Sequence, residues 1–355
     1  MSKEYNASVF IGRFQPFHNE HLNVLNAALD LAERVLIIIG SSNVASTVKN
    51  PFSYGERVQM ISRCLKPEDS SRVLFIPARD YYYNDNLWVA EVQQKTATYL
   101  RPNDQVALMG AYKDGSSYYL NLFPQWDFVP VPQKSFLNAT DIRRALFERT
   151  EKLMDFNPYH PDRARMSLVN NDWRKSIPYP VETWLENNYF QTSSYHDHVN
   201  EFQHYLEYRK QWGNGPFVTV DSIVTCSGHV LLVKRKFLPG KGLWALPGGF
   251  LKLYERIEDG ALRELKEETG IAVTKIMLKN QIEREKVFDY PNRSLRGRTI
   301  THAFHINLNQ KDLPDLRASD DAEDAKWMPL FDVFQNEELF FEDHFQILSY
   351  FVMRG

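Results

Sequence analysis

The residues of this chain that could do chemistry gather in two stretches, of which the acidic one is the more regular. Glu264, Glu267 and Glu268 stand at positions i, i+3 and i+4, so a helix would carry all three carboxylates on one face. Carboxylates held that close repel one another unless a cation neutralises them. Oxygen ligands suit Mg²⁺ or Mn²⁺, which also bind phosphate oxygens and lower the pKa of bound water. The pattern therefore predicts metal-assisted hydrolysis of a phosphoanhydride.

The spacing around these glutamates follows one rule throughout the stretch "GFLKLYERIEDGALRELKEETGI" (249–271). Its opening glycine is followed after five residues by Glu255, and after seven more by Arg263 and Glu264. Seven such fixed positions would match a random window about once in 10⁸, at roughly 7% usage of each residue type. A charged, solvent-exposed helix with an Arg263–Glu267 surface pair is the alternative, and this low chance of coincidence argues against it.

This stretch resembles the Nudix box, and the likeness extends upstream to "LWALPGG" (243–249). The resemblance implies that Glu267 is catalytic, and that Arg263 orients Glu255 and does not touch substrate. It also implies a set of ligands for Mg²⁺, with Mn²⁺ as the alternative. These ligands are Glu264, Glu267, Glu268 and, through its carbonyl, Gly248.

A basic stretch after the box would set the choice of substrate. "VFDYPNRSLRGRTITHAF" (287–304) resembles the corresponding part of Nudix domains that hydrolyse ADP-ribose, and of their NAD-linked regulator relatives. By that resemblance Arg293 and Arg296, with Arg298 beside them, would meet the diphosphate or a ribose. A solvated basic loop is the alternative interpretation.

The second stretch that could do chemistry is "VFIGRFQPFHNEHL" (9–22), in which His18 and His21 are three residues apart. The spacing alone decides nothing, because His302 and His305 share it. We expect that later pair to be structural, on opposite faces of a strand. The first pair directly follows an expected strand and begins a helix. Helix amides there favour anions, and a cationic imidazole can stabilise charge on a transferring phosphoryl group.

The histidine stretch resembles the (H/T)xGH signature of nucleotidylyltransferases, with Glu20 where glycine is usual. Two further stretches, "GSSNVASTVKNPFSYGER" (40–57) and "NDNLWVAEV" (84–92), resemble the archaeal-type nicotinamide-mononucleotide adenylyltransferases. "FLNATDIRRAL" (136–146) resembles the late S-x-T-x-x-R phosphate motif, with Asn138 in the serine position.

The resemblance implies a role for each matching residue. His18 and His21 would stabilise the transferred α-phosphate. Trp88 would stack on nicotinamide, since an aromatic face suits a cationic pyridinium, and packing in the core is the alternative for this residue. A helix N-terminus and a guanidinium would hold the triphosphate. The further substrate contacts implied are Arg13, Lys49, Asn86, Thr140 and Arg143.

The elements that must position the histidine pair belong to the first half of the chain. There, short β-branched runs alternate with helical patterns, which predicts an α/β domain with a Rossmann-like, doubly wound parallel sheet. Ser53 and Glu56 are spaced as a capping box and are expected to begin one of the helices. The expected strands lie at 8–12, 35–40, 72–78, 105–110 and 127–131.

The acidic stretch belongs to a second half with a different pattern, for which we expect an α+β Nudix domain. "VTVDSIVTCSGHVLLVKRK" (218–236) is typical of a hairpin around a Ser-Gly turn. A helix at about 257–269 and strands near 273–285 and 299–308 are expected to follow. The order of elements therefore differs from the alternation in the first half.

The length of 355 residues suits two domains. Residues 150–215 are polar, aromatic and dotted with proline, and their sequence indicates no role. We place the junction near residue 190. The expected domains are 1–190, the nicotinamide-mononucleotide adenylyltransferase domain, and 191–355, the Nudix hydrolase domain.

Composition excludes several classes of protein. A net charge of −3, with 43% hydrophobic and 25% charged residues, is that of a soluble globular protein and not of a dedicated nucleic-acid binder. No apolar run approaches the roughly 18 residues that span a bilayer, and the N-terminus lacks an apolar signal core. We therefore expect a cytoplasmic protein that binds neither nucleic acid nor membrane. Its two cysteines are expected to stay reduced, and its oligomeric state, a homo-oligomer included, is left open.

Together these features resemble the bacterial family that fuses a nicotinamide-mononucleotide adenylyltransferase to a Nudix hydrolase. The resemblance implies that one domain joins ATP and nicotinamide mononucleotide into NAD and pyrophosphate, with Mg²⁺ on the leaving group. The other would hydrolyse ADP-ribose to AMP and ribose 5-phosphate. One alternative changes the acceptor to phosphopantetheine or nicotinate mononucleotide. Another makes the Nudix half an ADP-ribose sensor or transcription regulator, although the complete carboxylate set argues against it.

Overall fold

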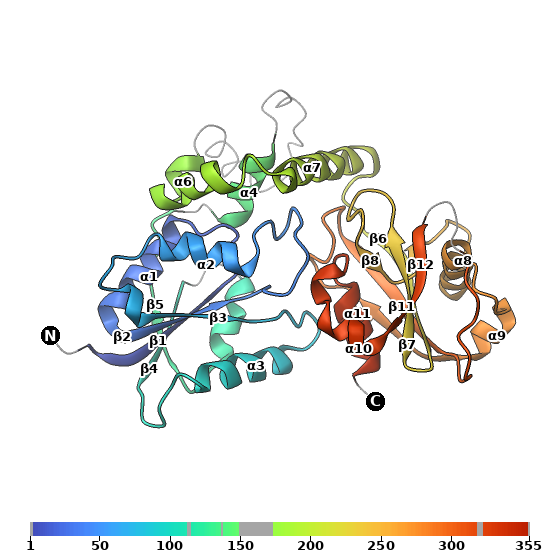
Figure 1. The fold of residues 1–355 in the computed structure, drawn as a ribbon, viewed down its shortest axis with the longest axis horizontal. Coiled ribbons are helices and arrows are strands. Elements are labelled where there is room, and N and C mark those ends of the chain that lie inside the picture. The colour runs from blue at the N-terminus through green and yellow to red at the C-terminus, as the bar shows by residue number, and fades with distance from the viewer. Residues whose placement is uncertain (1–2, 112–114, 136–137, 149–172, 318–321, 354–355) are drawn as a thin grey trace. The chain divides into compact units, whose positions relative to one another are not determined.

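The computed structural model describes residues 3–111, 115–135, 138–148, 173–317 and 322–353. The chain divides into two compact units, unit 1 (1–202) and unit 2 (203–355), whose elements are labelled in Figure 1. The division falls inside the long helix α7 (Ser193–Trp212), whereas the expected junction lies just before that helix begins. No helix within the described ranges is long and apolar enough to cross a membrane.

Unit 1 is built on a five-stranded parallel sheet with the strand order β3-β2-β1-β4-β5. The strands are β1 (Tyr5–Gly12), β2 (Ala32–Ile39), β3 (Val73–Pro77), β4 (Val106–Gly110) and β5 (Asp127–Pro130). All five expected strands are confirmed, and so is the doubly wound parallel sheet. The order reverses between β1 and β4, and ligands of such sheets bind beyond the carboxyl ends of the strands at this reversal.

Helices connect and cover these strands. They are α1 (Asn19–Leu31), α2 (Tyr54–Ser62), α3 (Asp85–Ala97), α4 (Ala139–Phe147), α6 (Tyr179–Asn188) and the first part of α7, with short 3₁₀ turns η1 (Ser70–Arg72), η2 (Gly115–Leu122) and η3 (Trp173–Ser176). The expected capping box of α2 is present, since the Ser53 amide donates to Glu56 Oε2 at 2.7 Å and Ser53 Oγ accepts from the Glu56 amide. One face of the sheet packs against Val92 of α3 and Phe123 near η2.

Unit 2 holds a mixed seven-stranded sheet in the order β10-β11-β6-β7-β12, with β8 paired to β7 and β9 paired to β6. Its strands are β6 (Phe217–Cys226), β7 (His229–Arg235), β8 (Trp244–Ala245), β9 (Gly248–Phe250), β10 (Ile282–Phe288), β11 (Thr299–Asn307) and β12 (Ala322–Pro329). The expected hairpin is confirmed as β6–β7. Ser227 and Gly228 make its turn with positive φ angles of 43° and 75°, as a two-residue type I′ turn requires.

The helices of unit 2 include the one that carries the acidic cluster. They are α8 (Ile257–Thr269), α9 (Lys275–Asn280), α10 (Leu330–Gln335) and α11 (His344–Val352), with the 3₁₀ turn η4 (Glu337–Leu339). The expected helix at 257–269 is confirmed as α8. The strand expected at 273–285 is wrong in its first part, because Thr274 Oγ1 accepts from the Met277 amide at 3.3 Å and caps α9. The strand there begins at Ile282 and continues to Phe288.

Candidate active sites

The histidine pair lies at the carboxyl end of β1, beside the reversal of strand order. His18 is the N-cap of α1, and its amide donates to His21 Nδ1 at 3.3 Å. The two rings stack with centroids 3.6 Å apart. Because Nδ1 of His21 accepts a hydrogen bond, the neutral ring carries its proton on Nε2 and can donate from that atom. His18 is buried, with 2% of its surface exposed.

Behind this pair, Arg57 is fully buried and joins the loops that follow β1 and β2. Its Nη1 donates to the carbonyls of Arg13 at 2.7 Å and Gly40 at 2.6 Å, and its Nη2 donates to that of Ser41 at 3.0 Å. Burial lowers the pKa of Arg57 to about 10. Sequence reasoning missed this residue, although it is the last residue of the "NPFSYGER" segment, four positions after the Ser53 cap.

Arg143 is a second buried arginine in the same region. Its Nη1 donates to the Gln15 carbonyl at 2.6 Å, and its Nη2 donates to Thr140 Oγ1 at 3.1 Å. Burial lowers the pKa of Arg143 to about 9, and the charge of Arg13 lowers it further. Arg13 lowers the pKa of Arg57 in the same way. The Arg13 guanidinium is therefore close enough to repel both buried arginines, and a bound anion would relieve that repulsion.

The N-terminus of α4 is arranged differently from what the phosphate motif implies. Asn138 Oδ1 accepts hydrogen bonds from the amides of Thr140 at 2.9 Å and Asp141 at 3.1 Å. These are amides that the resemblance assigns to triphosphate, and here the cap residue satisfies them. The Thr140 side chain is exposed and stays close to Arg143 through its hydroxyl.

The other predicted contacts in unit 1 lie on or near α3. Trp88 is half-buried and meets the Phe123 and Tyr119 rings edge-on, at centroid distances of 5.5 Å and 5.9 Å. Packing against the core is therefore present, and stacking on nicotinamide stays a prediction. Asn86 is exposed in the first turn of α3, and the Lys49 ammonium lies 5.1 Å from the centre of the Tyr82 ring.

Glu20, which stands in place of the usual glycine, has a structural partner. It is buried, and its Oε2 accepts from the Lys134 amide at 3.0 Å. This hydrogen bond joins α1 to the segment that follows β5. The histidine loop thus keeps its two histidines on α1 while gaining a link that a glycine would not give.

In unit 2, the helix α8 carries the three glutamates and also Arg263. Arg263 makes a bidentate pair with Glu255, with distances of 2.7 Å and 2.9 Å, as the resemblance implies. Its Nη1 also lies 2.7 Å from Glu264 Oε1 and 2.8 Å from Glu267 Oε2. One arginine therefore orients Glu255 and also makes the Arg263–Glu267 pair of the alternative interpretation. Hydrogen bonds from Arg263 lower the pKa of Glu255 to about 2.

Glu268 lies deeper than the other two glutamates. Its Oε2 accepts from the Gly248 amide at 2.9 Å, and the Gly248 carbonyl as a metal ligand stays a prediction. Burial raises the pKa of Glu268 to about 8 and raises that of Glu264 as well. A Cβ atom on Gly249 would lie 2.7 Å from the Glu264 carboxyl carbon, so a larger residue at this position would displace that carboxylate.

The three glutamates supply the oxygen ligands that a divalent cation prefers, although their carboxylates do not converge on one point. Among the described residues, no three His, Cys, Asp or Glu side chains converge as ligands, because Arg263 holds Glu264 and Glu267 while Gly248 holds Glu268. Two of these carboxyl groups have pKa values raised by burial, and a cation beside them would favour their charged form. Glu267 is 55% exposed and can leave Arg263 at little cost.

The basic stretch does not present its arginines as expected. The Arg293 side chain is 3% exposed and makes a bidentate pair with the fully buried Asp343, at 3.0 Å and 2.8 Å. The Arg293 guanidinium is therefore bound to Asp343. The structure does not show it exposed for a direct contact with diphosphate or ribose. Arg298 is paired with Asp289 and half-exposed, as in the solvated-loop alternative.

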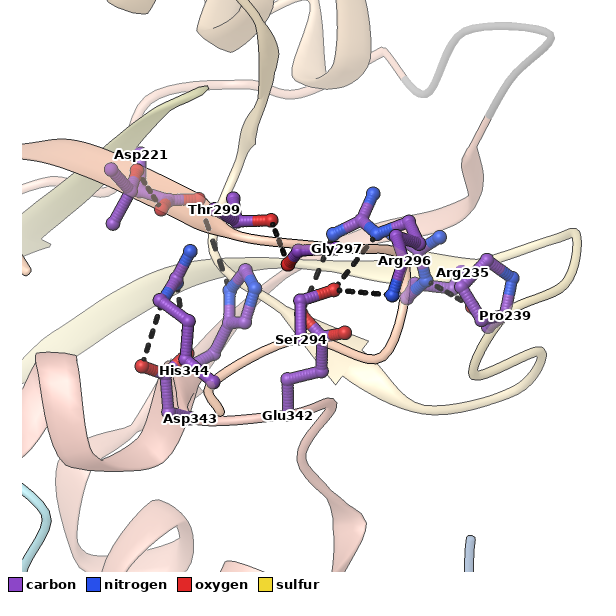
Figure 2. A network of polar contacts seen from close by, with 12 residues as sticks. Asp221, Arg235, Pro239, Ser294, Arg296, Gly297, Thr299, Glu342, Asp343 and His344 are labelled. Atoms are coloured by element: carbon purple, nitrogen blue, oxygen red, sulfur yellow. Dashed lines mark hydrogen bonds and ion pairs between the residues drawn. The ribbon is translucent and has the colours of Figure 1, made fainter. Parts of the chain in front are cut away.

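Arg296 stays within reach of the box. Its Nε donates to Ser294 Oγ at 3.2 Å, and its guanidinium lies 5.3 Å from the centre of the Phe250 ring, next to Gly249. Sequence reasoning missed its neighbour Arg235, at the end of β7, which lies 4.2 Å from the centre of the Phe341 ring. Figure 2 shows these two arginines together.

Neighbouring groups of both charges change the pKa of Arg235. Burial lowers the pKa of Arg235, and Arg296 lowers it further, whereas Glu342 and Glu268 raise it. The arginine pair is thus near the acidic cluster. The sequence signal that could have found Arg235 is its place in "VKRK", at the end of the second hairpin strand.

The later histidines are structural, as expected. His302 Nδ1 lies 3.4 Å from Glu285 Oε1 on the neighbouring strand β10. His305 is buried, and its Nε2 lies 3.0 Å from Thr225 Oγ1 on β6.

Comparisons with known proteins match a different family to each unit. Residues 9–145 match the cytidylyltransferase-like family model, and residues 215–351 match that of the NUDIX domain. Over 141 residues, 39% of this chain and 74% of the relative, it is 42% identical to the nicotinamide/nicotinic acid mononucleotide adenylyltransferase of Acinetobacter baylyi. Over 116 residues, 32% of this chain and 63% of the relative, it is 39% identical to an ADP-ribose pyrophosphatase of Methanocaldococcus jannaschii.

One solved structure is similar over nearly the whole chain. It is the bifunctional NMN adenylyltransferase/ADP ribose pyrophosphatase of Francisella tularensis, complexed with AMP and a manganese ion. The two chains are 36% identical, with a TM-score of 0.83 that covers 98% of this chain and 99% of the other. This chain therefore belongs to the family of bifunctional NMN adenylyltransferase/ADP-ribose pyrophosphatases.

Proposed function

We propose that the chain carries two active sites of NAD metabolism. Unit 1 transfers the adenylyl group of ATP to nicotinamide mononucleotide, giving NAD and pyrophosphate. Unit 2 hydrolyses ADP-ribose to AMP and ribose 5-phosphate, with Mg²⁺ as the metal. The observation that carries the proposal is the likeness to the Francisella tularensis enzyme over 98% of the chain, together with site residues in both units.

In unit 1 the chemistry is an in-line displacement at phosphorus. A phosphate oxygen of the mononucleotide forms a bond to the α-phosphorus of ATP, and the bond from that phosphorus to the bridging oxygen of pyrophosphate breaks. The Nε2–H of His21 donates to the oxygens of the transferred group, where negative charge increases. Arg13 and Arg143 stabilise the departing pyrophosphate, and Arg57 holds the loop that carries Arg13.

In unit 2 the acidic face of α8 and the arginine pair act on the same phosphoanhydride. Glu264, Glu267 and Glu268 would hold the divalent metal, which when bound polarises a phosphate oxygen and activates water. Arg235 and Arg296 bind the diphosphate from another side, each as a permanent cation. Water is added across the anhydride, so one P–O bond forms as another breaks.

A second acceptor for unit 1 has a specific observation in its favour. The relative from Acinetobacter baylyi is named for both nicotinamide and nicotinic acid mononucleotide. We propose that this chain also accepts nicotinate mononucleotide, which has a carboxylate in place of an amide.

The test is a product analysis with purified protein. It is incubated with Mg²⁺ or Mn²⁺ and ATP plus nicotinamide mononucleotide, nicotinate mononucleotide or phosphopantetheine, and separately with ADP-ribose and other nucleoside diphosphate derivatives. NAD with pyrophosphate, and AMP with ribose 5-phosphate, are the products expected. A chain that forms neither pair, or that binds ADP-ribose without cleaving it, contradicts the proposal for the unit concerned.

A further inference from the structure

We propose that Glu342 determines substrate specificity in unit 2 by accepting a hydrogen bond from a ribose hydroxyl of the bound diphosphate. The inference rests on the function proposed for unit 2, and it names the part of the substrate that one residue recognises. Glu342 lies outside the Nudix box and outside the basic stretch 287–304, immediately before α11 (Figure 2).

The backbone of Glu342 is in a conformation that most residues avoid. Its φ angle is 45°, in the left-handed region, which costs a residue with a Cβ atom about 1 kcal/mol or more. The next two residues hold it there. Asp343 is locked by its bidentate pair with Arg293, and His344 Nδ1 accepts from the Leu246 amide at 3.0 Å. The Glu342 side chain is therefore presented from a rigid position.

The carboxylate of Glu342 is buried and incompletely paired. Its side chain is 9% exposed, and its Oε2 makes a long contact of 3.4 Å with Arg296 Nη2. Among the described residues, none donates a hydrogen bond to its Oε1. An ionised carboxylate can accept several hydrogen bonds, and a buried acceptor without a donor is unfavourable. A ligand hydroxyl that reached this carboxylate would supply the missing donor.

The neighbours of Glu342 indicate which ligand group would supply the donor. Arg296 Nη2 lies 3.4 Å from the Glu342 carboxylate, and both Glu342 and Glu268 of the box act electrostatically on Arg235. The diphosphate binds to these arginines, but its oxygens carry no donor hydrogens and would repel Glu342. In ADP-ribose each phosphate is bonded directly to a ribose, whose hydroxyls are donors. The adenine amino group is one sugar farther away, so a ribose hydroxyl is the group within reach.

The test measures, by calorimetry, how a set of ligands binds to the wild type and to three variants. EDTA removes the metal and so blocks hydrolysis. The ligands are ADP-ribose, analogues that lack one hydroxyl on either ribose, and inosine diphosphate ribose, which lacks the adenine amino group. The main variant is Glu342→Gly, because glycine adopts a positive φ without strain and removes the carboxylate. Glu342→Gln keeps an acceptor without its charge, and Glu338→Gln is the control, at an exposed position four residues earlier.

The wild type is expected to bind one deoxy analogue about 10- to 100-fold more weakly than ADP-ribose, as for a hydrogen bond to a charged group. That difference should fall to about twofold in Glu342→Gly and should persist in Glu338→Gln. An equal difference in wild type and Glu342→Gly overturns the inference. A difference confined to the inosine ligand also overturns it, since Glu342 would then recognise the base. A wild type that releases no AMP from ADP-ribose when Mg²⁺ is restored overturns the proposed function itself, and melting temperatures verify that each variant is folded.

Discussion

The imidazole of His21 is held on two sides, by His18 stacked at 3.6 Å and by Phe17 stacked at 5.6 Å. Its Nδ1 accepts from the His18 amide, which leaves Nε2 to carry the donor proton. A ring confined in this way needs no reorganisation when charge develops on a phosphoryl group. His21 is thus the stronger catalytic candidate of the two histidines, because its ring is held in place and carries its donor proton on Nε2.

Replacing His21 by alanine removes that donor. We expect adenylyl transfer to fall by about 10²- to 10³-fold, the range found when one donor to a developing oxyanion is lost. The measurement is pyrophosphate release from ATP and nicotinamide mononucleotide. Hydrolysis of ADP-ribose by the same chain is the internal control and should not change. An unaltered turnover number for NAD formation would show that His21 has only a structural role.

Glu267 differs from its two neighbours because it is the most exposed and forms ion pairs with two basic side chains, Arg263 and Lys252. Changing Glu267 to glutamine removes one negative charge from the proposed metal site. We expect release of AMP from ADP-ribose to fall at least about 100-fold, with NAD synthesis intact. Asp259→Asn, a charge change in the first turn of the same helix, is the matched control. Hydrolysis that survives within a few-fold would contradict the metal assignment.

At the scale of elements, the site in unit 1 depends on how two helices begin. The histidines are at the N-terminus of α1, and Arg143 lies in the first turns of α4. The Asn138 cap sets the start of α4 and thereby the places of Thr140 and Arg143. Serine, the residue usual at this position of the motif, is also a good N-cap, so the substitution preserves the cap.

Replacing Asn138 by alanine tests that role. We expect a loss of about 1 kcal/mol in the stability of unit 1, the usual effect of removing an N-cap. We also expect a higher KM for ATP, because α4 carries Arg143. Asn138→Ser keeps a side-chain acceptor and should resemble the wild type in both measurements. An alanine variant with unchanged KM would separate the cap from substrate binding.

At the scale of the whole molecule, each unit contains a buried histidine that stays neutral in the folded state. His198 in unit 1 lies 2.7 Å from the Tyr189 hydroxyl and 3.3 Å from Ser46 Oγ. His344 in unit 2 accepts from the Leu246 amide. Burial lowers the pKa of both below the ordinary value of 6.5, although nearby carboxylates oppose the shift. Each unit therefore resists protonation at these sites.

The consequence for stability has a definite sign. Below about pH 6.5 the unfolded chain binds protons at these histidines that the folded chain does not, so the free energy of unfolding falls as the pH falls. We expect both units to unfold at lower urea concentration at pH 5.5 than at pH 7.5, followed by loss of each activity. His198→Gln should reduce the pH dependence of unit 1 only. A pH dependence that this variant leaves unchanged would exclude His198 as its source.

Features set by neighbouring residues were determined by the sequence itself. The five parallel strands, the β6–β7 hairpin and the helix of the acidic cluster follow from local periodicity and turn residues, and each was confirmed. The exception is α9, where a single cap at Thr274 begins a helix in a stretch that suggested a strand. Residue types at fixed spacing also identified both families, since a metal or phosphate requires particular side chains at particular intervals.

What the sequence could not determine are the partners that lie far apart along the chain. Arg293 is buried because Asp343, fifty residues later, meets it, and Arg57 is buried because carbonyls of two separate loops converge on it. Glu342 joins the candidate site only because the chain returns to Arg296 shortly before α11. Burial and hydrogen bonding depend on contacts between distant segments, so the availability of a charged side chain to a ligand was decided by the tertiary structure alone.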